Sequence, residues 1–92
     1  DPDWIDACMR AGFEYGADAV KVLYARDRFP QIIQTCPVPV VMAGGPKNGA
    51  LQQMVEETIR AGGRGCAIGR NVYGAENPAE VIRMLRKTVH GA

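Results

Sequence analysis

Lys21 is the residue whose position in the sequence most suggests chemistry. It lies inside a short apolar run, Asp-Ala-Val-Lys-Val-Leu-Tyr at residues 18–24, which is typical of a strand. Because side chains alternate along a strand, Val20 and Val22 share one face and Lys21 lies on the other. If the valines pack against helices, Lys21 lies on the opposite face, which becomes the interior of a barrel if the sheet closes. Partial desolvation there favours the neutral amine. Such an amine attacks a carbonyl to form a Schiff base; the competing interpretation is an edge-strand lysine whose ammonium reaches water.

Two loops rich in glycine follow the next two apolar runs. Gly44 and Gly45 come after the first of these runs, and Gly69 and Arg70 come after the second. Glycine lets backbone N–H groups approach an anion closely, and a guanidinium group matches the geometry of phosphate. These loops at the carboxyl ends of adjacent strands predict a phosphate site, and two ordinary glycine turns with a surface arginine are the alternative.

Other residues capable of chemistry are given smaller roles. Lys47 lies in a Gly/Pro/Asn loop, where we expect it to be hydrated and to serve at most to attract anions. His90 is near the end of the last predicted helix, where a catalytic role is not expected. Cys8, Cys36 and Cys66 show no Cys-x-x-Cys spacing, so we expect no metal site and three reduced, buried thiols, as in a cytoplasmic protein.

The composition is that of an ordinary soluble globular domain. The chain has 92 residues, of which 47% are hydrophobic and 23% charged, and a formal net charge of +1. This balance gives no basic surplus for nucleic acid, and no apolar stretch approaches the roughly 20 residues of a membrane span. The first residues lack the pattern of a signal peptide. We therefore expect a cytoplasmic protein without nucleic-acid or membrane partners.

Amphipathic helices are predicted between the strands. Four helices are expected: a first that begins after Asp1 and ends at Gly16, a short one over 27–35, a third with its apolar stripe from Leu51 to Ile59, and a last one that begins at Pro78. The three expected strands, over 18–24, 40–43 and 65–68, lie between them, and a turn over 71–74 follows the third strand. This alternation predicts an α/β fold with a parallel sheet and right-handed crossovers, and no domain boundary is evident.

Three blocks of the sequence, in this order and spacing, resemble one known family. They are residues 18–24, Cys-Pro-Val-Pro-Val-Val-Met-Ala-Gly-Gly-Pro-Lys at 36–47 and Gly-Arg-Asn-Val-Tyr at 69–73. The chain resembles, over essentially all its length, the class I Schiff-base aldolases, a family that includes archaeal-type fructose-bisphosphate aldolase, the aminodideoxyheptulosonate synthases and the autoinducer-2 phosphate thiolase. The resemblance implies that residues 1–92 are one segment, the carboxyl-terminal three βα units (strands six to eight) of a (β/α)8 TIM barrel.

The resemblance also implies an activity and a site. It makes Lys21 the Schiff-base lysine of a lyase that cleaves or forms a C–C bond in a small phosphorylated keto or sugar substrate. Gly44, Gly45, Gly69 and Arg70 would contact the substrate phosphate. No metal or organic cofactor is implied.

One segment departs from the aldolase pattern. Ala-Arg-Asp-Arg-Phe at 25–29 replaces the usual Thr-Gly-Asp segment, and the short spacing is more similar to the thiolase branch, which would transfer an acetyl group to coenzyme A as co-substrate.

The length limits what the chain can do by itself. A full barrel needs about 250 residues, and the acid/base residues of the family lie on earlier strands. We therefore expect the isolated segment to be inactive and to associate as a homo-oligomer through exposed sheet edges. A non-catalytic βα fragment that binds phosphate or only self-associates is the alternative.

Overall fold

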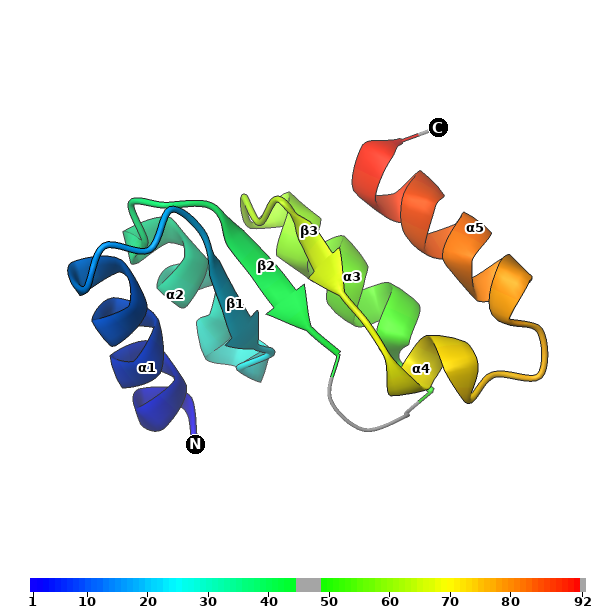
Figure 1. The fold of residues 1–92 in the computed structure, drawn as a ribbon, viewed down its shortest axis with the longest axis horizontal. Coiled ribbons are helices and arrows are strands. Elements are labelled where there is room, and N and C mark those ends of the chain that lie inside the picture. Colours follow the sequence, from blue (N-terminus) through cyan, green and yellow to red (C-terminus); the bar gives the residue numbers. More distant parts are fainter. Residues whose placement is uncertain (45–48, 92) are drawn as a thin grey trace.

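The computed structural model describes residues 1–44 and 49–91 and shows a three-stranded sheet with its helices (Figure 1). In chain order the elements are α1 (Pro2–Glu14), β1 (Val20–Leu23), the 3-10 turn η1 (Arg26–Arg28), α2 (Phe29–Thr35), β2 (Val40–Ala43), α3 (Leu51–Arg60), β3 (Gly65–Ala67), α4 (Arg70–Tyr73) and α5 (Pro78–His90). The strands are parallel in the order β1-β2-β3, which confirms the predicted alternation. The predicted turn after β3 is a single helical turn, α4.

The two long helices, α1 and α5, are each bounded by a capping side chain at the start and a left-handed glycine just beyond the end. The Asp1 carboxylate accepts a hydrogen bond from the Asp3 N–H at 2.9 Å, and Asn77 caps α5 in the same way. Gly16 and Gly91 have φ values of 98° and 75°, in the left-handed region that favours glycine. Each of these helices has 13 residues. Within the described residues no helix is long and apolar enough to cross a bilayer.

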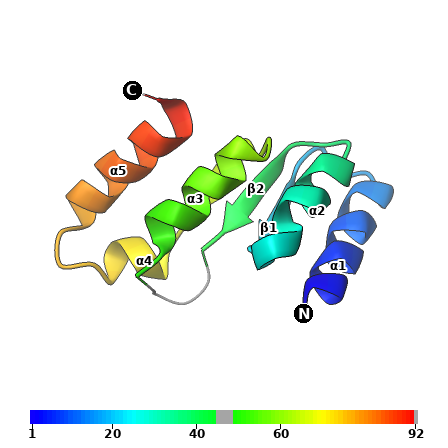
Figure 2. The ribbon, with the colours of Figure 1, turned by 180° about the vertical axis from the view of Figure 1, so that it is seen from behind.

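The sheet has one covered face and one open face. In Figure 1 the strands lie in front of α2 and α3, and Figure 2 shows these helices from behind. Val20 and Val22 are buried against the helices, whereas Lys21 and Leu23 are exposed on the other face, as the alternation predicted. Lys21 is level with Val41 of β2. The described chain therefore forms an open sheet with helices on one side.

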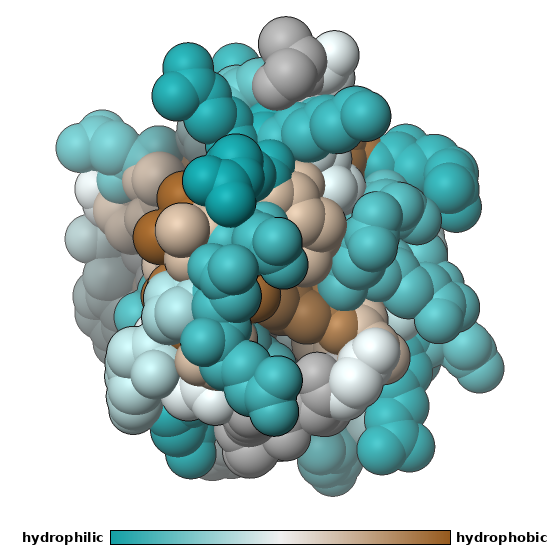
Figure 3. All heavy atoms as spheres, turned by 90° about the vertical axis from the view of Figure 1, so that its right-hand side faces the viewer, coloured by the Kyte–Doolittle hydropathy of each residue, from teal (hydrophilic) through white to brown (hydrophobic). Residues whose placement is uncertain are grey.

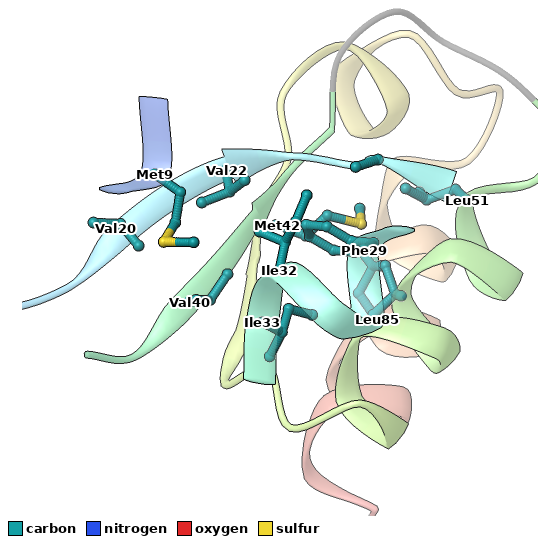
Figure 4. Close-up of a cluster of buried hydrophobic side chains, with 12 residues drawn as sticks. Met9, Val20, Val22, Phe29, Ile32, Ile33, Val40, Met42, Leu51 and Leu85 are labelled. Carbon is teal, nitrogen blue, oxygen red and sulfur yellow. The ribbon is translucent and has the colours of Figure 1, made fainter. Parts of the chain in front are cut away.

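The hydrophobic core lies between the covered face and the helices (Figure 4). Phe29, Ile32 and Met42 are essentially inaccessible to solvent. Thr58 is also fully buried, and its hydroxyl donates a hydrogen bond to the Met54 carbonyl at 2.8 Å. Packing is tight enough that a Cβ at Gly63 would lie 2.5 Å from the Thr58 Cγ2, so only glycine fits there. These contacts fix α2 and α3 on the sheet.

The outer helices α1 and α5 are only partly buried. On α1 only Met9 is buried and Cys8 is exposed, and Ile82 of α5 is 53% exposed. Cys36 and Cys66 are half-buried. The prediction of three buried thiols is therefore wrong. Cys8 is exposed because α1 lies at one end of the sheet and has neighbours on one side only (Figure 1).

Met42→Ala tests which face of the sheet carries the core. We expect a loss of about 2–5 kcal/mol in the free energy of unfolding, measured by chemical denaturation of the chain, because Met42 is fully buried. Leu23→Ala is the matched control on the open face and should cost less than about 0.5 kcal/mol. Equal losses in the two variants would contradict a one-sided core.

Candidate active site

Lys21 lies on the open face of the sheet, beside α1. It borders a groove of about 450 Å³ between α1 and β1, together with Trp4, Cys8 and Leu23. Its side chain is exposed. The expected desolvation of Lys21 is therefore not found in this chain, because three strands leave uncovered the face that a closed sheet would enclose.

Gly44 brings the loop after β2 against the loop after β3. Gly44 is buried, and its N–H donates a hydrogen bond to the Ala67 carbonyl at 3.4 Å. A Cβ at this position would lie 2.8 Å from the Ile68 Cδ1, so a side chain here would displace Ile68. The loops that follow β2 and β3 are thus neighbours, as their parallel register requires.

Gly69 and Arg70 form the start of the short helix α4. The Gly69 carbonyl accepts hydrogen bonds from the N–H groups of Val72 and Tyr73 at 2.9 and 3.0 Å. Arg70 is the first residue of α4 and is exposed. A Cβ at Gly69 would meet the Tyr73 ring at 3.5 Å, an ordinary contact, so packing does not require glycine there.

The predicted site residues share one sheet without sharing one enclosed cavity. Gly44 is three residues beyond Val41, the partner of Lys21, which places it about 10 Å further along the sheet. Lys21 and Gly44 border different grooves. Gly45 and Lys47, which were also assigned to this region, lie outside the described residues.

A side-chain pair that the sequence did not suggest links the end of β1 to α3. The Tyr24 hydroxyl donates a hydrogen bond to the Glu57 carboxylate. This bond, with burial and the nearby carboxylate charge, raises the pKa of Tyr24 to about 12. The Tyr24 ring also contacts Phe29 edge-on, with centroids 5.3 Å apart. The pair fixes the loop after β1 to the helix that follows the Gly44 loop.

A second groove lies over the carboxyl ends of β1 and β2. It has a volume of about 610 Å³ and is bordered by Leu23, Tyr24, Arg26, Ala43 and Gly44 among others. Of its walls the sequence indicated the Gly44 loop, but not the groove itself, because the walls come from segments that are far apart along the chain.

A third groove, of about 570 Å³, separates β3 from α5. On the side of the molecule shown in Figure 3, apolar atoms lie in a hollow among hydrophilic ones. Cys66 and His90 border it. Burial raises the pKa of the Cys66 thiol, which disfavours the reactive thiolate. Within the described residues, no group of three or more His, Cys, Asp or Glu side chains could hold a metal ion.

Comparison with known proteins identifies relatives over most of the chain. Residues 1–75 match the model of the DeoC/LacD family aldolases. The chain is 39% identical over 84 residues to 2-amino-3,7-dideoxy-D-threo-hept-6-ulosonate synthase 1 of Archaeoglobus fulgidus, a match that covers 89% of this chain and 32% of that protein. It is 32% identical over 93 residues to the 3-hydroxy-5-phosphonooxypentane-2,4-dione thiolase of Escherichia coli, covering 98% of this chain and 32% of that protein. The chain thus spans about a third of the length of these curated relatives.

A solved structure matches the whole fold. The crystal structure of an archaeal fructose 1,6-bisphosphate aldolase superposes with a TM-score of 0.91 and 34% sequence identity, covering 100% of this chain and 39% of that one. The predicted fold class, a parallel α/β part of a TIM barrel, is confirmed.

Tyr24→Phe tests the link between β1 and α3. The variant keeps the ring against Phe29 and loses the hydroxyl, so we expect a loss of about 1 kcal/mol in the free energy of unfolding. The pKa of Tyr24 is higher in the folded chain than its ordinary value of 10.0. The stabilisation should therefore be complete below about pH 10 and disappear as the pH rises through about 12.

Denaturation of both proteins across this pH range measures the difference. Tyr73→Phe is the matched control, because Tyr73 is 73% exposed, and it should change little at any pH. A Tyr24→Phe loss that stays constant up to pH 12 would contradict the hydrogen bond with Glu57.

Proposed function

The chain belongs to the DeoC/LacD aldolase family, and on this premise we propose that Lys21 is the Schiff-base residue of an aldolase acting on a small phosphorylated keto or sugar compound. The observation that supports this most directly is the position of Lys21 on the open face of β1, two residues before the strand ends. The loops carrying Gly44, Gly69 and Arg70 follow the neighbouring strands at the same edge of the sheet. In a (β/α)8 barrel the active site lies at this edge, built from the loops that follow the strands and from residues near the strand ends.

In the proposed reaction the Lys21 amine attacks the substrate carbonyl. A carbinolamine forms, and loss of water gives a protonated imine. This cation accepts the electron pair of the C–C bond that breaks, while a proton leaves the hydroxyl group of the departing aldehyde. The resulting enamine is protonated, and water releases the ketone and the free lysine. The reverse sequence forms the bond, and the imine itself is the electron sink, so the proposal includes no metal or organic cofactor.

The loops after β2 and β3 are proposed to hold the substrate phosphate. Contact of Gly44 with Ile68 keeps these loops adjacent, which supports a shared anion site. Arg70 adds a guanidinium at the start of α4. Gly45 is part of the same proposal from the sequence. The phosphate would anchor one end of the substrate while Lys21 reacts with its carbonyl.

The chain is proposed to act as part of a complete barrel. The described residues form a sheet of three parallel strands, whose open face and strand edges need covering by further βα units. By itself we expect no turnover, and association into homo-oligomers through the exposed face. We also propose a cytoplasmic location without nucleic-acid or membrane partners.

A thiolase activity is the second candidate. The short segment after β1 resembles the thiolase branch, and the similarity to the Escherichia coli thiolase extends over 98% of the chain. In this case Lys21 would form the same kind of imine, and the thiol of coenzyme A would add to a second carbonyl of the substrate. The C–C bond on the imine side of that carbonyl would then break, which releases an acetyl thioester and passes the electron pair to the imine. Product analysis with and without coenzyme A distinguishes the two activities.

Borohydride trapping tests the role of Lys21. In the complete polypeptide that carries this chain, reduction in the presence of a keto phosphate should give a stable adduct, located on Lys21 by peptide mass spectrometry. Lys21→Met should abolish the adduct and the turnover, whereas Lys87→Met, on the exposed side of α5, should keep both. Substrate binding without any adduct in the unsubstituted protein would rule out the Schiff-base mechanism.

Arg70→Ala tests the phosphate site. Loss of a charge-assisted hydrogen bond costs about 1.5–3 kcal/mol, so we expect the half-saturating concentration of a keto phosphate to rise about 10- to 100-fold. Arg64→Ala is the matched control, because Arg64 is exposed and precedes β3 at the opposite edge of the sheet. Phosphate binding that depends on Arg70 but gives no adduct would favour the non-catalytic binding fragment.

A further inference from the structure

We propose that Arg26 is a specificity-determining residue, whose guanidinium binds a second anionic group of the substrate or co-substrate. This inference rests on the proposed function of Lys21 and deepens it. The group recognised is a phosphate or a carboxylate, since both accept hydrogen bonds from a guanidinium in the same planar arrangement.

The position of Arg26 in the fold places it beside the proposed reaction. It is the first residue of η1 and follows the end of β1 by three residues. It borders the groove of about 610 Å³ over the carboxyl ends of β1 and β2, and Gly44 borders the same groove. Arg26 therefore lies at the same edge of the sheet as the proposed phosphate loops, but at the strand that carries Lys21.

The backbone at Arg26 is unusual. Its φ of 54° is in the left-handed region, and it is the one non-glycine residue with a positive φ among the residues described. Glycine, asparagine and aspartate adopt this conformation more readily than a long side chain does. Non-glycine residues in this region are energetically costly and are concentrated at active sites and ligand sites, where the surrounding structure holds them in place.

Among the residues that the structure describes, the acidic ones near Arg26 do not pair with its guanidinium, which is therefore available to bind an anion. Glu57 of α3 and Asp27 of η1 are the acidic residues that border a second, outer groove together with Arg26. The Glu57 carboxylate accepts a hydrogen bond from the Tyr24 hydroxyl. Arg28 pairs with Asp3. Within the described residues the exposed Arg26 guanidinium makes no hydrogen bond or salt bridge of its own, in contrast to Arg28.

The arrangement also indicates where a second anion would come from. With the loops after β2 and β3 proposed to hold one end of a substrate joined to Lys21, the loop after β1 is the described loop at this edge that is left for its other end or for a co-substrate. That loop carries Arg26. Arg26 would therefore distinguish compounds with an anionic group at this end from compounds without one.

The Arg26→Gly variant removes the guanidinium without adding backbone strain, so it tests the role of the side chain alone. Glycine accepts the φ of 54° without strain, so the fold should be kept or stabilised, as denaturation would show. In the complete polypeptide we expect the half-saturating concentration to rise at least about tenfold for fructose 1,6-bisphosphate and for 2-keto-3-deoxy-6-phosphogluconate. It should change less than about twofold for dihydroxyacetone phosphate, which has a single anionic group.

Fructose 1,6-bisphosphate has a phosphate as its second anionic group, and 2-keto-3-deoxy-6-phosphogluconate has a carboxylate. Comparing the two therefore shows which group Arg26 binds, and an effect on either compound supports the inference. Arg26→Lys should restore part of the affinity. Arg60→Ala, which removes an exposed guanidinium from the outer groove, should leave all three compounds unchanged. Equal effects of Arg26→Gly on all three compounds, or no effect on any, would overturn the inference.

Failure of the proposed function would give a different result. In that case no compound gives a borohydride adduct on Lys21 in the unsubstituted protein. Calorimetric titration of fructose 1,6-bisphosphate then decides the role of Arg26 by binding alone. Weaker binding of this compound to Arg26→Gly, with unchanged binding of dihydroxyacetone phosphate, supports Arg26, and unchanged binding of both contradicts it.

Discussion

The parallel pairing of β1, β2 and β3 is the constraint on which the other features of this chain depend. Parallel strands end at the same edge of the sheet, so the loops carrying Arg26, Gly44 and Gly69 are brought together although they are far apart in the sequence. The alternation of side chains then decides which face each residue occupies. With Val20 and Val22 buried under the helices, Lys21 has no position other than the opposite face.

Contacts above the strands add precision to this arrangement. Gly44 approaches the loop after β3 so closely that Ile68 occupies the space of the missing side chain. Tyr24, at the end of β1, is hydrogen-bonded to Glu57 of α3. The first contact joins the loops after β2 and β3, and the second joins the end of β1 to the helix after β2. All three carboxyl ends are therefore held relative to one another without a closed barrel.

The open face shows what this chain lacks by itself. Lys21 and Leu23 are exposed on a surface where a complete barrel has a packed interior. The groove beside Lys21 and the groove above Gly44 are separate. Further strands would enclose both within one ring, which is why the activity is proposed for the assembled barrel, with the lysine, the loops proposed to bind phosphate and Arg26 as the contribution of this segment.

The sequence by itself determined the alternation of elements, the face of Lys21 and the ends of the long helices, because periodicity, capping residues and glycine act over a few neighbouring positions. The first helix follows Asp1 and ends just before Gly16, and the last begins at Pro78, as predicted. The exposure of Cys8 was decided by the tertiary structure, since it depends on how many neighbours α1 has at the end of the sheet. The Tyr24–Glu57 bond joins residues 33 positions apart, and the left-handed backbone of Arg26 occurs in a residue type that rarely adopts it. Neither leaves a local pattern, so both required the folded chain.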